Sequence, residues 1–260
     1  MNAFRLLADD LTGALDTTAE LVPLAGAVPV FWPRVMPAAP KGSAAFDSAT
    51  RECAPEEAAV ETARSCRHLQ GAALAFKKID SLIRGATLHE IAACMRTGAW
   101  PCAILAPAFP FQRRITRGGQ QLVQINGTWT LTGPHLVSAL ATLGVRAHLA
   151  HDDLIPGVNV FDADSDDALR TIAALGRRHP GAVLWIGTGG LAQALAADYP
   201  PPVPALPQPV LGLFGSDQPA TLDQLAACAE HWLELDTDAH DPMIQGPMIQ
   251  HPVIERMQAT

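Results

Sequence analysis

The chain has 260 residues and a formal net charge of −8, with 18 Lys and Arg against 26 Asp and Glu. Hydrophobic residues make up 48%, and the apolar runs stop well short of the ~20 residues that cross a bilayer, so we expect a folded globular protein without a membrane partner. The start lacks a basic segment followed by an apolar one, and the five cysteines have no CxxC spacing, so we expect a cytoplasmic protein with neither a disulfide framework nor a zinc site.

The first predicted strand, residues 4–8, runs directly into a helical pattern that begins near Thr12 and Gly13. Asp9 and Asp10 therefore fall at the carboxyl end of a strand, where open α/β sheets bind ligands. Helix capping accounts for one of these acids but leaves the other unexplained. A pair of carboxylates is suited to a kinase or hydrolase, as a general base for a substrate hydroxyl or as a ligand for Mg²⁺.

A second strand is predicted at residues 27–32, followed by a Pro-rich connection, another short strand and a polar turn. Arg51 lies in this turn, before a helix with acids in its first turn. It either pairs with Glu52 or Glu56 at the surface or extends into the same cleft as Lys77. Taken alone, the residues favour the surface pair, which contributes little stability.

Residues 77–85, KKIDSLIRG, carry the densest polar chemistry of the chain. They follow an apolar run at 73–76 and precede a helical pattern with His89 and Glu90 on its polar face, so we place them at the carboxyl end of a strand. The alternative is a solvated loop in which Asp80 or Ser81 caps the helix.

The charge distribution favours a ligand site in this region. Residues 77–117 contain seven basic and two acidic side chains in an otherwise acidic protein. A concentration of positive charge in a cleft attracts small anions. We therefore predict an anionic small molecule as ligand and disfavour a nucleic acid, which needs a broad positive face.

A constrained loop follows the next predicted strand, residues 103–106. Prolines at 107 and 110 fix its path, and Arg113, Arg114 and Arg117 are suited to bidentate capture of a carboxylate or phosphate. A solvated basic loop is the alternative, mainly for Arg117. The Asn126-Gly127 pair beyond it predicts a β-hairpin.

From residue 134 onward, helix and strand patterns alternate, which predicts an α/β fold with an open, mostly parallel sheet flanked by helices. Gly187, Gly189 and Gly190 lie between a strand and a helix and could cradle a phosphate, although the Lys of a Walker motif is absent. We predict a first domain at residues 1–198, a Pro-rich linker at 199–209, and an incomplete second α/β domain at 210–260.

Four stretches, LADDLTGALDT, FKKIDSLIRG, LAPAFPFQRRITRGGQ and LFGSDQPATLDQ, together resemble the four-carbon acid sugar kinase family, also called the YgbK-like or DUF1537 family. The resemblance spans roughly residues 4–235. It implies phosphorylation of an acid sugar such as threonate, erythronate or 3-oxo-tetronate, with ATP and Mg²⁺ as cofactors. It also implies an acid-sugar site in the amino-terminal domain and most of the nucleotide site in the carboxyl-terminal one.

The resemblance implies roles for individual residues. Catalytic roles fall on Asp10 and Asp80. Substrate contacts fall on Asp9, Thr12, Arg51, Lys77, Lys78, Ser81, Arg84 and Arg114. Nucleotide contacts fall on Gly189, Gly190, Gly215 and Ser216, and no residue is assigned to a metal. The sequence departs from the family at Arg113, where Gly is usual, and at Leu82, where Thr is frequent.

Three functions are compared. The first is an acid-sugar kinase. The second is a truncated, catalytically impaired chain that binds the acid sugar, because family members are longer and their later Gly-rich nucleotide segments have no counterpart after residue 235. The third is a metal-dependent hydrolase that uses the paired aspartates, for which no third carboxylate or His stands at a matching spacing. A homo-oligomer is compatible with each of them.

Overall fold

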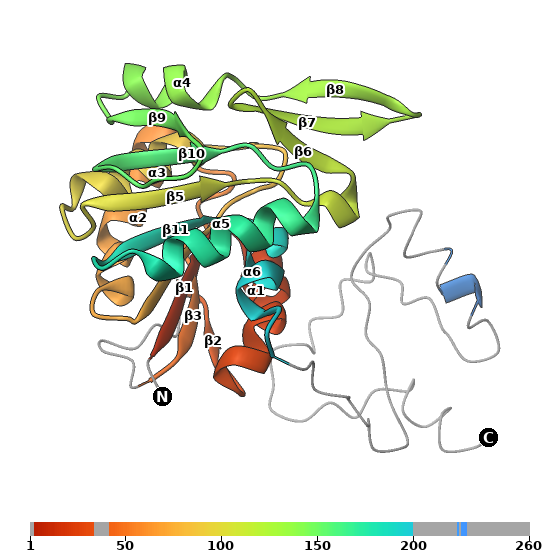
Figure 1. The fold of residues 1–260 in the computed structure, drawn as a ribbon. Coiled ribbons are helices and arrows are strands. Elements are labelled where there is room, and N and C mark those ends of the chain that lie inside the picture. Colours follow the sequence, from red (N-terminus) through yellow and green to blue (C-terminus); the bar gives the residue numbers. More distant parts are fainter. Residues whose placement is uncertain (1–2, 34–41, 200–222, 224, 228–260) are drawn as a thin grey trace, which may run out of the picture. The chain divides into compact units, whose positions relative to one another are not determined.

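The computed structural model describes residues 3–33, 42–199, 223 and 225–227 (Figure 1). The chain divides into two units, residues 1–204 and 205–260, and nearly all described residues belong to the first. The linker at residues 199–209 and the second domain at residues 210–260 therefore stay predictions. Gly215 and Ser216 lie outside the described residues.

The first unit is built on an eight-stranded sheet in the order β2-β3-β1-β4-β11-β5-β10-β9, with every neighbouring pair parallel. A parallel sheet is covered on both faces, so its strands are nearly continuous apolar runs. This confirms the predicted fold class. The strands are β1 (Phe4–Ala8), β2 (Val30–Phe31), β3 (Ala44–Asp47), β4 (Leu74–Lys78), β5 (Cys102–Ala106), β9 (Ala147–Ala150), β10 (Gly157–Phe161) and β11 (Val183–Gly187).

Helices cover both faces of the sheet, and each face has its own apolar core (Figure 1). On one face lie α1 (Leu11–Ala25), α5 (Asp166–Arg178) and α6 (Gly189–Ala196). On the other lie α2 (Pro55–Ser65), the 3-10 helix η2 (Cys66–Leu69), α3 (Thr87–Arg96) and α4 (Leu136–Thr142). None of the helices in the described part of the chain is long and apolar enough to cross a bilayer.

A small antiparallel sheet is joined to the large one through the loop after β5. The 3-10 helix η3 (Pro110–Gln112) leads into β6 (Arg114–Arg117), β7 (Gln120–Ile125) and β8 (Thr128–Thr132). Asn126 and Gly127, with φ of 49° and 81°, form the turn between β7 and β8. Both central residues have positive φ, as a two-residue hairpin requires, and the predicted hairpin is confirmed.

The structure differs from the predicted elements in four places. β2 has two residues instead of six, β9 was not predicted, and Arg114 to Arg117 form the strand β6 instead of a loop. β4 extends through Lys78, so Lys77 and Lys78 belong to a strand and not to the loop after it. The four described cysteines are free, as expected, and Cys66, Cys94 and Cys102 are buried.

Candidate functional site

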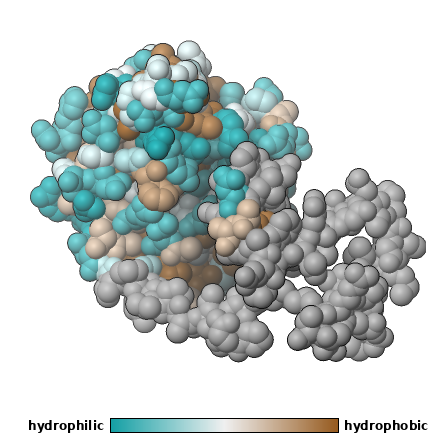
Figure 2. Space-filling model, turned by 90° about the vertical axis from the view of Figure 1, so that its right-hand side faces the viewer, coloured by the Kyte–Doolittle hydropathy of each residue, from teal (hydrophilic) through white to brown (hydrophobic). Residues whose placement is uncertain are grey.

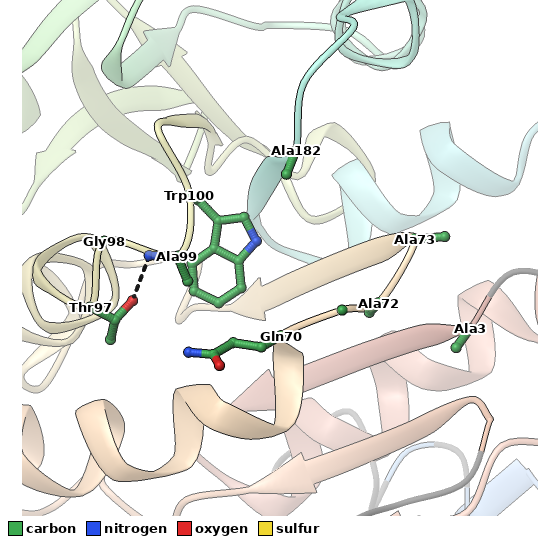
Figure 3. Close-up of a pocket in the computed structure, with 10 residues that line it drawn as sticks. Ala3, Gln70, Ala72, Ala73, Thr97, Gly98, Ala99, Trp100 and Ala182 are labelled. Atoms are coloured by element: carbon green, nitrogen blue, oxygen red, sulfur yellow. Dashed lines mark hydrogen bonds between the residues drawn. The ribbon is translucent and has the colours of Figure 1, made fainter.

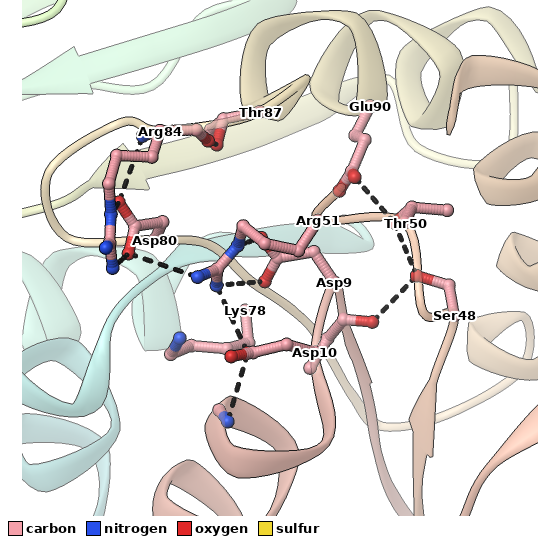
Figure 4. Close-up of polar contacts among 12 residues, drawn as sticks. Asp9, Asp10, Ser48, Thr50, Arg51, Lys78, Asp80, Arg84, Thr87 and Glu90 are labelled. Carbon is pink, nitrogen blue, oxygen red and sulfur yellow. Dashed lines mark hydrogen bonds and ion pairs between the residues drawn. The ribbon is translucent and has the colours of Figure 1, made fainter. Parts of the chain in front are cut away.

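Three neighbouring strands, β3, β1 and β4, end side by side and carry the predicted site residues in the loops that follow (Figure 4). Asp9 and Asp10 follow β1, Arg51 lies in the turn after β3, and Asp80 follows β4. Because the carboxyl ends of parallel strands meet at one edge of the sheet, side chains from distant parts of the sequence converge there.

The Arg51 guanidinium lies at the centre of this group (Figure 4). Its Nη2 is 2.9 Å from Asp9 Oδ1 and 3.1 Å from Asp10 Oδ1, and its Nε also pairs with Asp9. Its Nη1 is 3.5 Å from Asp80 Oδ1. Three carboxylates from two loops therefore hold one guanidinium, whose side chain is 15% exposed.

The expected surface pair of Arg51 with Glu52 or Glu56 is wrong. The carbonyl of Asp9 accepts hydrogen bonds from the backbone N–H groups of Thr50, at 2.9 Å, and Arg51, at 3.0 Å. These bonds fold the turn over the end of β1 and direct Arg51 inward. Arg51 extends inward to Asp9, Asp10 and Asp80, whereas Lys77 is fully buried, so a cleft shared by Arg51 and Lys77 stays a prediction.

Asp80 organises its own loop. It accepts hydrogen bonds from the backbone N–H groups of Leu82, at 3.1 Å, and Arg84, at 3.0 Å, and its Oδ1 is 2.7 Å from Arg84 Nη2. Burial alone would raise its pKa, but the hydrogen bonds from Arg84 and the charge of Arg51 outweigh burial and bring the pKa of Asp80 to about 2. A carboxylate of such low pKa is a weak proton acceptor at neutral pH. The catalytic role of Asp80 stays a prediction, and its contacts favour a role in holding the two arginines.

Asp10 is the most accessible of the three carboxylates. Its side chain is 32% exposed, against 2% for Asp9 and 5% for Asp80. Its Oδ1 accepts a hydrogen bond from Gly13 N at 3.0 Å and caps α1. Thr12 lies exposed in the same first turn. Asp9, in contrast to Asp10, is almost fully buried. Burial would raise the pKa of Asp9, but the hydrogen bond from Arg51 lowers this pKa below the ordinary value.

Lys78 approaches the start of α1 from β4. Within the described ranges, no residue forms a hydrogen bond or ion pair with its ammonium. Burial lowers the pKa of Lys78, although the negative charges of Asp9 and Asp10 act in the opposite direction. A Cβ on Gly13 would lie within 2.6 Å of both Asp10 Oδ1 and Lys78 Nζ, so a larger residue at this position would displace both side chains.

The structure corrects the expectations for Lys77 and Glu90. Their side chains are 0% and 1% exposed, and Lys77 Nζ is 2.6 Å from Glu90 Oε2. Side chains alternate along a strand, so Lys78 points toward α1 and Lys77 toward α3, which carries Glu90. A fully buried ammonium has no surface to offer a ligand, and Glu90 does not lie on a solvated helix face.

Ser81 and Arg114 meet at the side of the site next to the small sheet. Arg114 Nη1 donates hydrogen bonds to Ser81 Oγ and, at 2.6 Å, to Gln112 Oε1. Arg114 is half-buried, and burial lowers the pKa of its guanidinium. Its neighbour Arg113 is exposed and stands in the left-handed region, with φ of 55°.

Tertiary contacts reduce the predicted excess of positive charge. Three cations of residues 77–117 pair with acids, in Lys77–Glu90, Arg84–Asp80 and Arg117–Asp164. Counting charge along this segment ignores Asp9 and Asp10, which fold against it. Of the cations predicted to contact the substrate, Lys78 and Arg114 have no acidic partner within 4 Å in the described part of the chain.

Packing accounts for Gly189 and Gly190 at the start of α6. A Cβ on Gly189 would lie 3.0 Å from the Phe109 ring, and one on Gly190 would lie 2.7 Å from the Ala108 carbonyl oxygen. Both glycines are buried, with Thr188 as N-cap. Close contact with the loop after β5 thus explains these glycines, and their contact with a nucleotide stays a prediction.

Two pockets lie at opposite edges of the sheet. The larger, about 600 Å³, is at the amino ends of β4, β5 and β11 (Figure 3) and contains no charged side chain. Its lining comprises Ala3, Gln70, Gly71, Ala72, Ala73, Thr97, Gly98, Ala99, Trp100 and Ala182. The smaller, about 410 Å³, is next to the first turn of α1 and is lined by Leu11, Trp32, Pro33 and Asp47. The surface visible in Figure 2 carries hydrophilic residues with hydrophobic ones between them. The charged candidate residues Asp9, Asp10, Arg51 and Asp80 lie at the carboxyl ends of the strands, outside both pockets.

Among the described residues, no group of three or more His, Cys, Asp or Glu side chains is arranged to hold a metal ion. Asp9 and Asp80 point their oxygens at arginines. Asp10, with its partly exposed carboxylate, is the member of the group that best fits a contact with a metal carried by another molecule.

Comparison with known proteins gives a consistent result. Residues 4–148 match the family described as sugar-binding N-terminal domain. A D-threonate kinase of Cupriavidus necator is 35% identical, and the match covers 81% of this chain and 60% of that protein. A D-threonate kinase of Bordetella bronchiseptica is 30% identical, over 85% of this chain and 61% of that protein. The chain thus spans about 60% of the length of these relatives.

A solved structure from Bordetella bronchiseptica, of a domain of unknown function (DUF1537), is similar with a TM-score of 0.59 and 25% identity. The match covers 75% of this chain and 56% of that one, which was crystallised with bound citrate as a domain-swapped dimer. A Haemophilus influenzae DUF1537 protein, 18% identical with a TM-score of 0.59, shares the fold, over 75% of this chain and 56% of that one. The chain belongs to the four-carbon acid sugar kinase family, through its sugar-binding N-terminal domain.

Proposed function

We propose that this chain binds a four-carbon acid sugar of the threonate type at the carboxyl ends of β1, β3 and β4, as the substrate site of an ATP-dependent kinase. The observation that carries the proposal is the arrangement of Lys78, Arg51 and Asp10 around one edge of the sheet. The names of the two D-threonate kinases and the citrate bound in the similar DUF1537 structure support a small carboxylate ligand.

Each group has a proposed role. Lys78 and Arg114, the cations without acidic partners, bind the carboxylate of the acid sugar. The accessible oxygen of Asp10 accepts the hydrogen bond of the reacting hydroxyl and acts as general base. Arg51 orients Asp10, and Arg84 keeps the Asp80 loop in place. Phosphoryl transfer needs mainly positioning and charge stabilisation, which these groups supply.

ATP and Mg²⁺ are the proposed cofactors. Mg²⁺ is commonly held by one or two carboxylates together with substrate phosphates, and Asp10 fits the protein's share of such a site. Close packing is enough to explain the glycines of α6, and their contact with the nucleotide stays a prediction. ATP supplies the transferred phosphoryl group when bound.

The second candidate is a chain that binds the acid sugar without phosphorylating it. Its support is the span of about 60% of the relatives' length. ATP consumption with and without D-threonate separates the two candidates. Consumption that depends on the acid supports the kinase, whereas saturable acid binding without consumption supports the binding chain.

Calorimetry with D-threonate and D-erythronate tests the site itself. We expect saturable binding that weakens at least about tenfold in Lys78→Ala or Arg84→Ala, each of which removes a charged contact or its support. Arg178→Ala, at an exposed position of α5, is the matched control and should leave the affinity unchanged. Unchanged affinity in both site variants would refute the assignment. We also propose self-association, as in the dimeric relative, which the molar mass in solution tests.

A further inference from the structure

A chain of buried polar groups lies beneath the candidate site and offers nothing to a ligand directly (Figure 4). Glu90 Oε2 pairs with Lys77 Nζ at 2.6 Å, and Glu90 Oε1 accepts a hydrogen bond from Thr50 Oγ1 at 2.6 Å. Thr50 Oγ1 lies 2.9 Å from Ser48 Oγ, which donates to the carbonyl of Ala8 at 2.8 Å. These contacts connect α3, β4, the turn after β3 and the end of β1.

The burial of these groups calls for an explanation. Ser48 is 4% exposed, Thr50 and Lys77 are 0% exposed, and Glu90 is 1% exposed. An ion pair in such a place loses its hydration, and a well-packed apolar pair would serve stability at least as well. A role in positioning explains why the buried ion pair and the hydroxyl groups are present. Hydrogen bonds fix the turn that carries Arg51 in one conformation, which apolar packing would do less precisely.

The network fixes the turn that positions the Arg51 guanidinium. Thr50 precedes it in the chain, and both residues donate their backbone N–H groups to the carbonyl of Asp9. The Thr50 hydroxyl anchors this turn to the buried Glu90. The backbone of Arg51 is thereby held in place, and its guanidinium contacts Asp9, Asp10 and Asp80. Lys77 also acts on Asp9 through its charge, which lowers the pKa of that carboxyl.

We infer that Glu90 and Thr50 are positioning residues of this site. Glu90, held by Lys77, binds the Thr50 hydroxyl and thereby sets the position of the Arg51 guanidinium between the three aspartates. The consequence for ligand affinity rests on the proposed function, whereas the consequence for Arg51 itself does not.

Thr50→Val is the main test, because it removes the hydroxyl, keeps the shape of the side chain and leaves the Lys77–Glu90 pair intact. Glu90→Gln is less suitable, since it leaves a buried ammonium without its counter-charge and risks unfolding. Thr50→Ser restores the hydroxyl. Thr62→Val is the matched control: Thr62 is 0% exposed on α2, and its hydroxyl has no hydrogen-bond partner among the described residues.

Two measurements are made on the folded full chain, with folding verified by thermal melts. The first is the rate of Arg51 modification by phenylglyoxal, followed by peptide mass spectrometry. The second is D-threonate affinity by calorimetry. In Thr50→Val we expect modification several-fold faster and affinity at least about tenfold lower, while Thr50→Ser and Thr62→Val stay within about twofold of the parent.

The outcomes separate this inference from the proposed function. If Arg51 is modified faster in Thr50→Val but not in the control variants, the positioning role is supported. This holds even if neither the parent nor any variant binds D-threonate, because that result would refute only the proposed ligand. A folded Thr50→Val protein with parental Arg51 reactivity would overturn the inference. So would an equal increase in Thr62→Val, because the effect would then come from general loosening of the fold.

Discussion

Replacing Arg113 with glycine should stabilise the protein. Arg113 has φ of 55° and ψ of 44°, the left-handed conformation that closes η3. A side chain costs about 1–2 kcal/mol there, and the greater freedom of glycine in the unfolded chain offsets about 0.5–1 kcal/mol of the gain. The net effect is a gain of about 0.5–1 kcal/mol, which raises the Tm of a domain of this size by roughly 1–4 °C.

Little is lost with the Arg113 side chain, which is exposed and has no hydrogen bond or ion pair to any other described residue. The backbone bonds remain: its N–H donates to the carbonyl of Pro110 at 2.8 Å, and its carbonyl accepts from Gln124 at 3.0 Å. Scanning calorimetry measures the change in Tm. Arg117→Gly is the control, because Arg117 is also exposed but lies in β6, where glycine weakens a strand.

The reasoning is refuted if Arg113→Gly leaves Tm unchanged or lowers it as Arg117→Gly does. The same variant tests a contact with the ligand. A lower affinity for the acid sugar would show that Arg113 binds the anion in addition to Arg114, whereas an unchanged affinity would leave backbone conformation as its main effect.

Three further predictions concern the site. Asp10→Asn should lower turnover more than acid-sugar affinity, because it removes a proton acceptor and keeps a polar contact; equal losses in steady-state kinetics and calorimetry would point to positioning instead. Gly13→Ala should leave the free energy of unfolding within about 1 kcal/mol of the parent, since alanine favours helices, but should displace the Asp10 carboxylate and the Lys78 ammonium and weaken acid-sugar binding in calorimetry; unchanged affinity would contradict the tight approach. The pKa of Asp80, about 2 in the fold against 3.8 ordinarily, implies stabilisation of about 2 kcal/mol that is complete above pH ~4 and lost as the pH falls toward 2, so the stability of Asp80→Asn in urea should depend less on pH in this range. A parental pH slope in that variant would show that other carboxyls carry the effect.

Periodicity predicted most of the large elements, because buried parallel strands and amphipathic helices leave clear patterns. Residues 4–8 are an example: the strand was predicted over the same range that β1 occupies in the structure. β9 was missed because its four residues, AHLA, neither alternate nor form an apolar run. The predicted strand at 27–32 was too long, since only Val30 and Phe31 pair with β3.

The convergence of Asp9, Asp10 and Asp80 was predictable, since each follows a strand in a parallel sheet. The role of Glu90 was not, because a single acid on a helix is usually solvated. One signal was present. In a sheet covered on both faces, successive strand residues are both buried, so a Lys at position 77 needs an acid from the facing helix. The signal became visible only once β4 was known to extend through Lys78.

Charge was the least predictable property, because neutralisation depends on tertiary contacts. Arg51 is surrounded by aspartates, and the remaining open groups are the Lys78 and Arg114 cations and the partly exposed Asp10 carboxylate. A ligand with one carboxylate and neighbouring hydroxyls matches this set, since its carboxylate meets the cations and a hydroxyl donates to Asp10. A ligand with negative charge along its whole length would place one of its anionic groups against the Asp10 carboxylate. The repulsion there would offset the attraction to Lys78. Because the site combines cations with an accessible carboxylate, it favours hydroxy acids over simple polyanions. The excess of basic residues counted along the sequence could not make this distinction.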